Sequence, residues 1–148
     1  MDTGRQDRLR YSITKDFPRA DALALYRAAG WFGPSDPAPE LDAMIANSFA
    51  VSAAFDSAGH LVGMARALSD GVSDGYILDV VVDPGHRSQG VGRMIVKRLA
   101  DYLASLGIDW IVCIGVPGTE TFYRATGAAP MEGHTAFRFG AKSGVETK

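Results

Sequence analysis

The sequence predicts an α/β domain in which helices cover both faces of a central mixed sheet. The first observation is size, since 148 residues is close to the commonest length of a single domain. The second is pattern, since short apolar runs typical of strands alternate with stretches whose apolar residues recur at helical spacing. The third is composition, since 47% hydrophobic and 22% charged residues are ordinary for a globular protein and exclude a collagen-like repeat. We expect one domain over residues 1–148, frayed at about residues 1–7 and 141–148.

The first third of the chain predicts one strand and two helices. Apolar and polar residues alternate over residues 9–13, which favours a strand. A helix follows with Pro18 in its first turn and Gly30 at its end, the positions that these two residue types prefer. Residues 31–39 hold three prolines and a glycine and predict a loop, after which residues 40–47 predict a short helix.

The middle of the chain is rich in predicted strands. Residues 49–55 and 60–67 flank the turn-forming residues 56–59, which predicts an antiparallel hairpin. Another turn is expected over residues 70–75. Residues 76–82 form the most strongly β-branched run of the sequence and predict a central strand.

The last part of the chain predicts a long helix, a strand, a short helix and a final strand. The long helix follows two closely spaced glycines and ends at Gly107, and its apolar residues fall on one face. A buried strand is expected over residues 110–114, and a short helix closed by Gly127 over residues 119–125. Residues 137–139 would supply the last strand.

Charge and composition exclude several partners. A formal net charge of −2 gives no overall attraction to nucleic acid or to anionic membranes. Cys113 is the single cysteine, so no internal disulfide can form, and its apolar strand favours a core position over a nucleophile. The first residues lack the apolar stretch of a secretory signal, and no apolar run approaches the roughly 20 residues of a membrane span. We therefore expect a soluble, cytoplasmic protein.

The segment that carries chemistry runs from the central strand through a tight loop into the long helix. The first turn of a helix has backbone N–H groups without internal partners, and the helix dipole makes that end positive. Gly90 and Gly92 remove Cβ atoms that would hold an anion away, and Arg87 and Arg93 add positive charge. The arrangement suits a diphosphate better than a carboxylate or a metal ion. The alternative is that the glycines only permit a tight connection between strand and helix.

Two common phosphate-binding motifs do not fit this segment. A Walker A loop needs Gly-Lys followed by Ser or Thr, whereas Gly92 is followed by Arg93. A dinucleotide-binding fingerprint needs a third glycine where Ile95 stands. The histidines are isolated and lack metal-ligand spacing, so no metal site is expected at His60, His86 or His134.

The pattern Arg-x-x-Gly-x-Gly, met by Arg87, Gly90 and Gly92, resembles the acetyl-CoA loop of the GCN5-related N-acetyltransferase (GNAT) superfamily. The run Val80-Val81-Val82-Asp83-Pro84 and the segment Phe122-Tyr123-Arg124-Ala125-Thr126-Gly127 resemble two further elements of that family. The resemblance covers roughly residues 9–139. It implies a GNAT-type fold, with a twisted, mixed but mostly antiparallel sheet of six to seven strands in the order β-α-α-β-β-β-α-β-α-β.

The resemblance implies a cofactor site and a general acid. In this family pantetheine lies along the motif strand, and the N–H that corresponds to Val80 faces the developing oxyanion. Tyr123 would protonate the leaving thiolate, unless it is an ordinary core tyrosine. The cofactor-binding residues implied are Val80, Val81, Val82, Arg87, Ser88, Gln89, Gly90, Val91, Gly92, Arg93 and Tyr123.

The general base is not where the family often has one. Tyr76 and Leu78 stand at positions of the motif strand that several members fill with glutamate or histidine. Asp79 is the only carboxylate within the strand, and a bulge that family members carry here could re-aim it. Two routes for the proton stay open, with Asp79 as base or substrate anchor, or with a water chain past Tyr76, which we favour. Val116 replaces an asparagine common in the family, so contacts of pantetheine with that segment also stay open.

The resemblance places the acceptor site among the first two helices, their loop and the turns beside the motif strand. The candidate lining residues are Trp31, Phe32, Asp70 and Tyr76. An aromatic wall with a carboxylate suits a cationic amine. Equally open is that Trp31 only packs the helix pair and that Asp70 only makes its turn.

The function predicted from these residues is acetyl-CoA-dependent N-acetylation of a small molecule's primary amine, by direct attack in a ternary complex. A homodimer is expected from the resemblance, and neither nucleic acid nor membrane is an expected partner. Two alternatives remain open. One is a non-catalytic acyl-CoA sensor or interaction module, and the other is an acetyltransferase that acts on a protein N-terminus or lysine.

Overall fold

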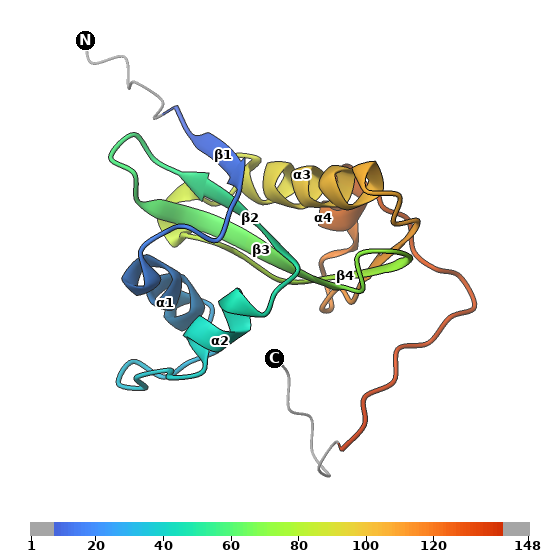
Figure 1. The fold of residues 1–148 in the computed structure, drawn as a ribbon, viewed down its shortest axis with the longest axis horizontal. Coiled ribbons are helices and arrows are strands. Elements are labelled where there is room, and N and C mark those ends of the chain that lie inside the picture. Colours follow the sequence, from blue (N-terminus) through green and yellow to red (C-terminus); the bar gives the residue numbers. More distant parts are fainter. Residues whose placement is uncertain (1–7, 141–148) are drawn as a thin grey trace.

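A five-stranded sheet forms the centre of the structure, a computed structural model that describes residues 8–140 (Figure 1). The ends expected to fray, residues 1–7 and 141–148, lie outside the described residues. The strands are β1 (Arg10–Ile13), β2 (Ala50–Phe55), β3 (Leu61–Ser69), β4 (Asp74–Val82) and β5 (Trp110–Cys113). The helices are α1 (Arg19–Ala28), α2 (Leu41–Ala46), α3 (Val91–Ser105) and α4 (Glu120–Ala125), with a short 3-10 turn, η1 (Pro84–His86), before α3. The predicted α/β class is confirmed.

The sheet is mixed, as predicted. It is antiparallel from β1 to β4, and β5 is parallel to β4. A parallel pair needs a crossover connection, which α3 supplies. Pairing of β4 with β5 ends where Ile77 lies opposite Cys113, whereas β4 continues to Val82. The two strands therefore diverge, and this half of β4 has no described strand beside it on the β5 side.

Helices cover both faces of the sheet, and each face has its own hydrophobic core. Figure 1 shows α1 and α2 on one side of the sheet and α3 on the other. α3 buries Ile95, Leu99 and Leu103 completely, at the spacing of one helical turn that its apolar stripe predicted. The opposite core buries Tyr26 and Ile45. Within residues 8–140, no helix has the length and hydropathy needed to cross a bilayer.

β4 carries the expected β-bulge, at Asp79. Two steps along β3, from Met64 to Arg66, span three steps along β4. Asp79 accommodates the extra residue with a φ of +52°. The bulge exchanges the two faces of the strand, because Ile77 packs in the core under α3 whereas Val81 packs in the core with α1 and α2. In a regular strand residues four apart share a face.

The tail after α4 does not form the predicted last strand. Residues 128–140 contain only turns and irregular segments, and Phe137 and Phe139 are 82% and 95% exposed. Figure 1 shows this segment leaving the body and passing at a distance from the sheet. The alternating pattern suits a strand, but a strand forms only against an edge with which it can pair. The described part of the chain therefore has five strands instead of six to seven.

Candidate active site

A cleft of about 1230 Å³ opens where β4 and β5 diverge. Its walls come from the second half of β4, the start of α3, the segment from β5 to α4, the loop after α1 and the tail. The lining residues are Trp31, Tyr76, Ile77, Leu78, Asp79, Val80, Val82, His86, Arg87, Ser88, Gly90, Val91, Gly92, Arg93, Ile114, Val116, Pro117, Thr119, Phe122, Tyr123, Ala136, Phe137, Arg138 and Phe139. Most of the predicted cofactor residues thus meet in one place.

The loop between β4 and α3 leaves the start of α3 open. Asp83 fixes η1, because its Oδ2 accepts a hydrogen bond from the Gly85 N–H at 3.0 Å and lies 3.0 Å from the His86 ring. Ser88 and Gly90 then adopt positive φ values of 61° and 80°. Apart from Gly90 and its neighbours in the chain, no described residue has an atom within 4 Å of the point where a Cβ on Gly90 would stand. The N–H groups of the first turn, which have no partner within the helix, therefore lie at an open part of the cleft.

Two arginines flank this opening. The Nε of Arg87 donates to the carbonyl oxygen of Val82 at 3.1 Å, which holds its guanidinium beside the end of β4. Arg93 lines the cleft from the first turn of α3. Their charge adds to the helix dipole, so this end of the cleft fits a diphosphate. Among residues 8–140, no three His, Cys, Asp or Glu side chains are grouped closely enough to hold a metal ion.

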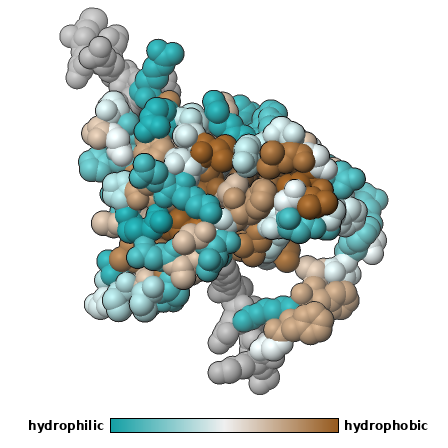
Figure 2. Space-filling view, in the orientation of Figure 1, coloured by the Kyte–Doolittle hydropathy of each residue, from teal (hydrophilic) through white to brown (hydrophobic). Residues whose placement is uncertain are grey.

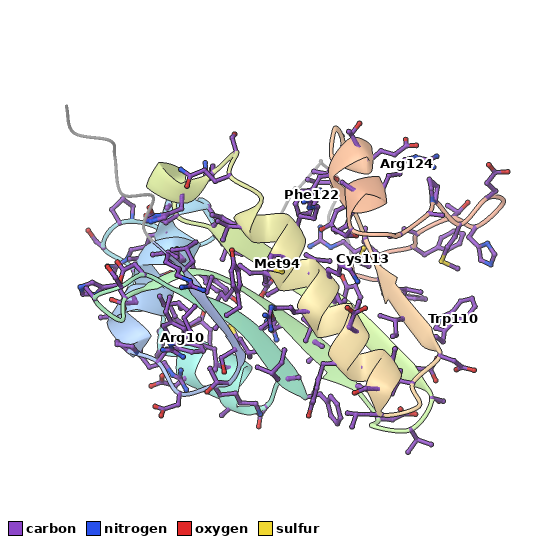
Figure 3. All side chains as sticks on the ribbon, turned by 90° about the horizontal axis from the view of Figure 1, so that it is seen from above. Arg10, Met94, Trp110, Cys113, Phe122 and Arg124 are labelled. Carbon is purple, nitrogen blue, oxygen red and sulfur yellow. The ribbon has the colours of Figure 1, made fainter. Side chains whose placement is uncertain are left out.

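The two sequence motifs meet in space at Gly92 and Phe122. A Cβ on Gly92 would lie 3.1 Å from the Phe122 ring, so the missing side chain permits α4 to approach α3. Figure 3 shows Phe122 on α4 beside the amino-terminal half of α3. The ring of Phe122 contacts that of Tyr123 edge to face, with centroids 4.9 Å apart. The contact between the helices thus positions Tyr123 in the cleft.

Tyr123 is half-buried and lies in a group with Tyr76 and Cys113. Burial, with smaller contributions from Cys113 and Tyr76, raises the pKa of Tyr123 to about 12. Its hydroxyl therefore stays protonated and can donate a hydrogen bond to a leaving thiolate. Burial also raises the pKa of the Cys113 thiol, which makes it a poor nucleophile at neutral pH.

The bulge turns Asp79 toward the interior. Its Oδ2 accepts hydrogen bonds from the Nε of Arg66 at 2.7 Å and from the hydroxyl of Tyr26 at 2.8 Å. The side chain of Asp79 is 2% exposed and that of Arg66 is 10% exposed, so they form a buried ion pair. Burial and the neighbouring Asp79 raise the pKa of Tyr26 far above its usual range, which keeps its hydroxyl a donor.

Two of the four residues expected at the acceptor site line the cleft. Trp31 and Tyr76 do so from the loop after α1 and from β4. Trp31 also packs edge-on against Tyr26, with ring centroids 5.1 Å apart. Phe32 does not line the cleft, and its ring stacks on that of Tyr26 at a centroid distance of 5.8 Å.

Three further predicted residues lie off the cleft. Asp70 accepts hydrogen bonds from the N–H groups of residues 72–74, which lower the pKa of its carboxyl well below the usual range, and it makes the turn between β3 and β4. The bulge moves Val81 into the core on the α1 side. Gln89 folds back and donates to the carbonyl of Gly85 at 3.4 Å. We therefore leave the side chains of these three residues out of the site.

Other residues of the site were not singled out from the sequence. Thr119 and Pro117 line the cleft from the segment before α4, and Phe137 of the tail is among its lining residues. Arg66 and Tyr26, which hold Asp79, are 13 and 53 residues away from it in the chain. Arg66 could have been noticed as a lone arginine in an otherwise apolar strand. No local sequence pattern indicates that Tyr26 contacts Asp79.

Comparisons with known proteins agree with this geometry. The profile of the acetyltransferase (GNAT) family matches residues 7–127. A histone acetyltransferase, TAP1, of Glycine max is 32% identical over 134 residues, which cover 84% of this chain and 57% of that protein. The chloroplastic serotonin N-acetyltransferase 2 of Oryza sativa subsp. japonica is 40% identical over 76 residues, which cover 51% of this chain and 38% of that protein. The chain thus spans about half the length of these curated relatives.

Solved structures of low sequence identity share the fold. A GNAT-family acetyltransferase from Streptococcus pneumoniae has a TM-score of 0.72 at 22% identity and covers 89% of this chain and 97% of its own. An aminoglycoside acetyltransferase from an uncultured soil metagenomic sample, solved in complex with sisomicin, has a TM-score of 0.69 at 18% identity. That match covers 90% of this chain and 97% of the other.

Proposed function

Because the chain belongs to the acetyltransferase (GNAT) family, we propose that it transfers an acetyl group from acetyl-CoA to the primary amine of a small molecule. The observation that carries the proposal is one continuous cleft that joins the open start of α3 to Tyr123 and Trp31. Similar proteins described as serotonin and aminoglycoside acetyltransferases support a small amine as acceptor.

The cleft fits acetyl-CoA in two places. The backbone of residues 88–92 would hold the diphosphate, with Arg87 and Arg93 balancing its charge, because the positive φ values in this loop leave its face open. The pantetheine arm would lie along β4 beyond Ile77, where backbone groups have no β5 partner. Bound there, acetyl-CoA supplies a thioester, which is an acyl group activated toward an amine.

Two groups of the chain would act on the reacting atoms. The N–H of Val80, directly after the bulge, would donate to the negative charge that develops on the thioester oxygen. The hydroxyl of Tyr123, on the α4 wall, would donate to the sulfur as the thiolate leaves. The raised pKa of Tyr123 keeps that hydroxyl protonated at neutral and moderately alkaline pH.

The acceptor must lose a proton before it attacks, since an alkylammonium with a pKa of about 10.4 has no free electron pair. Water in the cleft would carry that proton past Tyr76. The geometry supports this route over direct transfer to Asp79, since the Oδ2 of Asp79 already accepts hydrogen bonds from Arg66 and Tyr26.

Aromatic side chains form much of the acceptor end of the cleft. Trp31 lines it from the loop after α1 and Tyr76 lines it from β4. Aromatic walls suit an amine with an apolar body, and their electron-rich faces attract an ammonium group. A protein lysine or N-terminus is the second candidate acceptor, because a relative is described as a histone acetyltransferase.

The tail supports a homodimer as the working form. Figure 2 shows the tail standing apart from the body with apolar surface on it. Phe137 and Phe139 are 82% and 95% exposed, and Trp110 on β5 is 50% exposed. No strand covers the outer edge of β5 in the described part of the chain. In a homodimer the apolar tail of each copy would cover the open β5 edge of the other, so the two contacts would be equivalent.

The test of the function combines calorimetric titration of acetyl-CoA with a thiol-release assay over a panel of amines. Binding together with coenzyme A release in the presence of small apolar amines supports the proposal. Release with peptide lysines or N-termini alone would move the acceptor to proteins. Binding of acetyl-CoA without release of coenzyme A for any amine would favour a non-catalytic sensor. Absence of acetyl-CoA binding would contradict the proposal.

A further inference from the structure

Asp79, which lines the cleft from β4, forms a buried ion pair with Arg66 of β3. The pair joins β3 to β4 at the step where their register shifts, and both side chains are nearly inaccessible to water. Replacing a buried ion pair by apolar residues is often neutral or stabilising, so stability alone does not account for such a pair. Its position at the bulge points instead to control of backbone conformation.

The backbone at Asp79 is strained, and its side chain is anchored by hydrogen bonds from two other elements. A φ of +52° is rare for residues other than glycine and costs free energy, which aspartate and asparagine tolerate better than other residue types. Arg66 from β3 and Tyr26 from α1 both donate to the same carboxylate oxygen of Asp79. Three elements of the fold therefore converge on this one residue.

The strained residue sets the direction of the next N–H group. The peptide that joins Asp79 to Val80 contains the N–H that would donate to the thioester oxygen. A regular strand at this step would place Val81 under α3, whereas the bulge places it with α1. The conformation of Asp79 thus decides how the Val80 N–H is presented to the cleft.

The same carboxylate links the two halves of the site. Tyr26 donates to Asp79 and contacts the ring of Trp31, which lines the acceptor end. A shift of Asp79 would therefore move both the Val80 N–H, which would bind the thioester oxygen, and the Trp31 ring at the acceptor end of the cleft.

We propose that Asp79 is a positioning residue. Held by Arg66 and Tyr26, it fixes the bulge of β4 so that the Val80 N–H faces the thioester oxygen, and it takes no proton from the substrate. The inference rests on the proposed function, because that function assigns the Val80 N–H to the oxyanion.

The test compares three variants that differ in how well they tolerate a positive φ at position 79. Asp79→Ala loses the carboxylate that Arg66 and Tyr26 hold, and alanine also tolerates a positive φ poorly. Asp79→Gly loses the carboxylate but keeps a residue that tolerates a positive φ. The double variant Arg66→Met/Asp79→Asn removes both charges but keeps a residue that tolerates this φ and accepts from Tyr26. Positioning predicts that turnover falls least in the double variant, more in Asp79→Gly and most in Asp79→Ala, where the loss is about a hundredfold, as for one oxyanion donor.

The pH profile separates positioning from base catalysis. The acidic limb of kcat/KM should keep its shape in all three variants and change only in height. Equal and severe losses in all three, together with loss of that limb, would identify Asp79 as the base. Full turnover in Asp79→Ala would overturn the inference outright. Asp101→Ala, on the solvent side of α3, is the matched control and should behave as wild type.

Folding and the parent function are checked separately. Acetyl-CoA affinity should stay within a few-fold of wild type in every folded variant, because the diphosphate loop is untouched. If Asp79→Ala does not fold, Tyr26→Phe is the deciding variant. Its control is Tyr102→Phe, because Tyr102 is a partly buried tyrosine of α3 that does not line the cleft. Turnover should fall several-fold in the first and not in the second, and equal turnover in both would count against positioning. Wild-type protein that neither binds acetyl-CoA nor releases thiol would contradict the proposed function itself.

Discussion

Gly92 of α3 lies against the ring of Phe122 of α4, at a distance that leaves little room for a side chain at position 92. Tyr123 follows Phe122 in a helix of only six residues, so this contact also fixes where Tyr123 stands. The absence of a side chain at Gly92 therefore permits α4 to pack against α3 and to place Tyr123 on the wall of the cleft.

Gly92→Val should separate the two helices. Its Cβ would lie 3.1 Å from the Phe122 ring, and the added methyl groups make relief by a small shift insufficient. We expect the free energy of unfolding to fall by about 1–3 kcal/mol, the usual cost of overpacking, and turnover to fall with it. Gly92→Ala is the control, because the gain of about 1 kcal/mol in helix propensity offsets its tighter contact. Urea denaturation measures the free energy of unfolding of Gly92→Val and Gly92→Ala. Equal stability of the two variants would contradict the account.

Gly90→Trp should remove the diphosphate site without unfolding the protein. Gly107, at the other end of α3, offers a matched control, since its φ of +87° resembles the +80° of Gly90 and both have open space around them. The backbone strain of the two tryptophan variants is therefore alike. We expect acetyl-CoA affinity to fall about 100-fold, or about 2.7 kcal/mol, in Gly90→Trp alone. Calorimetry that finds equal affinities in the two variants would remove the loop from the site.

Tyr123→Phe should slow turnover and leave cofactor affinity nearly unchanged. Loss of a general acid typically costs about 10²–10⁴-fold in rate. Burial raises the pKa of Tyr123 to about 12, and a raised pKa keeps the acid protonated to higher pH. The wild-type rate should therefore show no decline from this group up to pH 10, the ordinary pKa of tyrosine. A descending limb centred near pH 10 that disappears in Tyr123→Phe would show that the hydroxyl is exposed and unperturbed.

Arg66→Met should be far more destabilising than its combination with Asp79→Asn. The single change leaves the Asp79 carboxylate buried without its counter-charge, which typically costs about 3–5 kcal/mol. The double variant has no buried charge at this place and should recover most of that loss. Unfolding free energies of the wild type, both single variants and the double variant give the coupling directly. Strict additivity would mean that the two side chains do not interact.

Phe137→Ser combined with Phe139→Ser should dissociate the proposed homodimer. The two rings are the most exposed large apolar side chains among the described residues. Val72→Ser is the control, because Val72 is 74% exposed but lies in the turn between β3 and β4. Light scattering after gel filtration should show a dimer for the wild type and for Val72→Ser, and a monomer for the double variant. A monomeric wild type would contradict the proposed assembly.

Local patterns in the sequence predicted most of the fold. The alternation of residues 9–13, the apolar stripe of α3 and the β-branched run of β4 each satisfy a burial requirement that is visible within a few residues. The tail shows where this reasoning ends. Phe137 and Phe139 have a strand-like pattern, but pairing depends on an edge that local sequence does not position.

The candidate site likewise contains features that local sequence predicted and features that it did not. The open loop between β4 and α3 could be predicted because its shape depends on neighbouring residues, with Arg87 and Gly90 only three positions apart. The contacts of the Asp79 side chain could not be predicted, because its partners Arg66 and Tyr26 are distant in sequence and only the fold brings them together. Asp70 was ambiguous for the same reason, since a carboxylate in a turn looks alike in sequence whether it serves the turn or a ligand.

The most direct test of the account is a crystal structure of the protein with acetyl-CoA bound. The account predicts that the diphosphate accepts hydrogen bonds from the backbone N–H groups at the start of α3, with Arg87 and Arg93 beside it and the thioester between Val80 and Tyr123. Density for acetyl-CoA elsewhere on the molecule, or a helix start filled by the protein's own side chains, would contradict it.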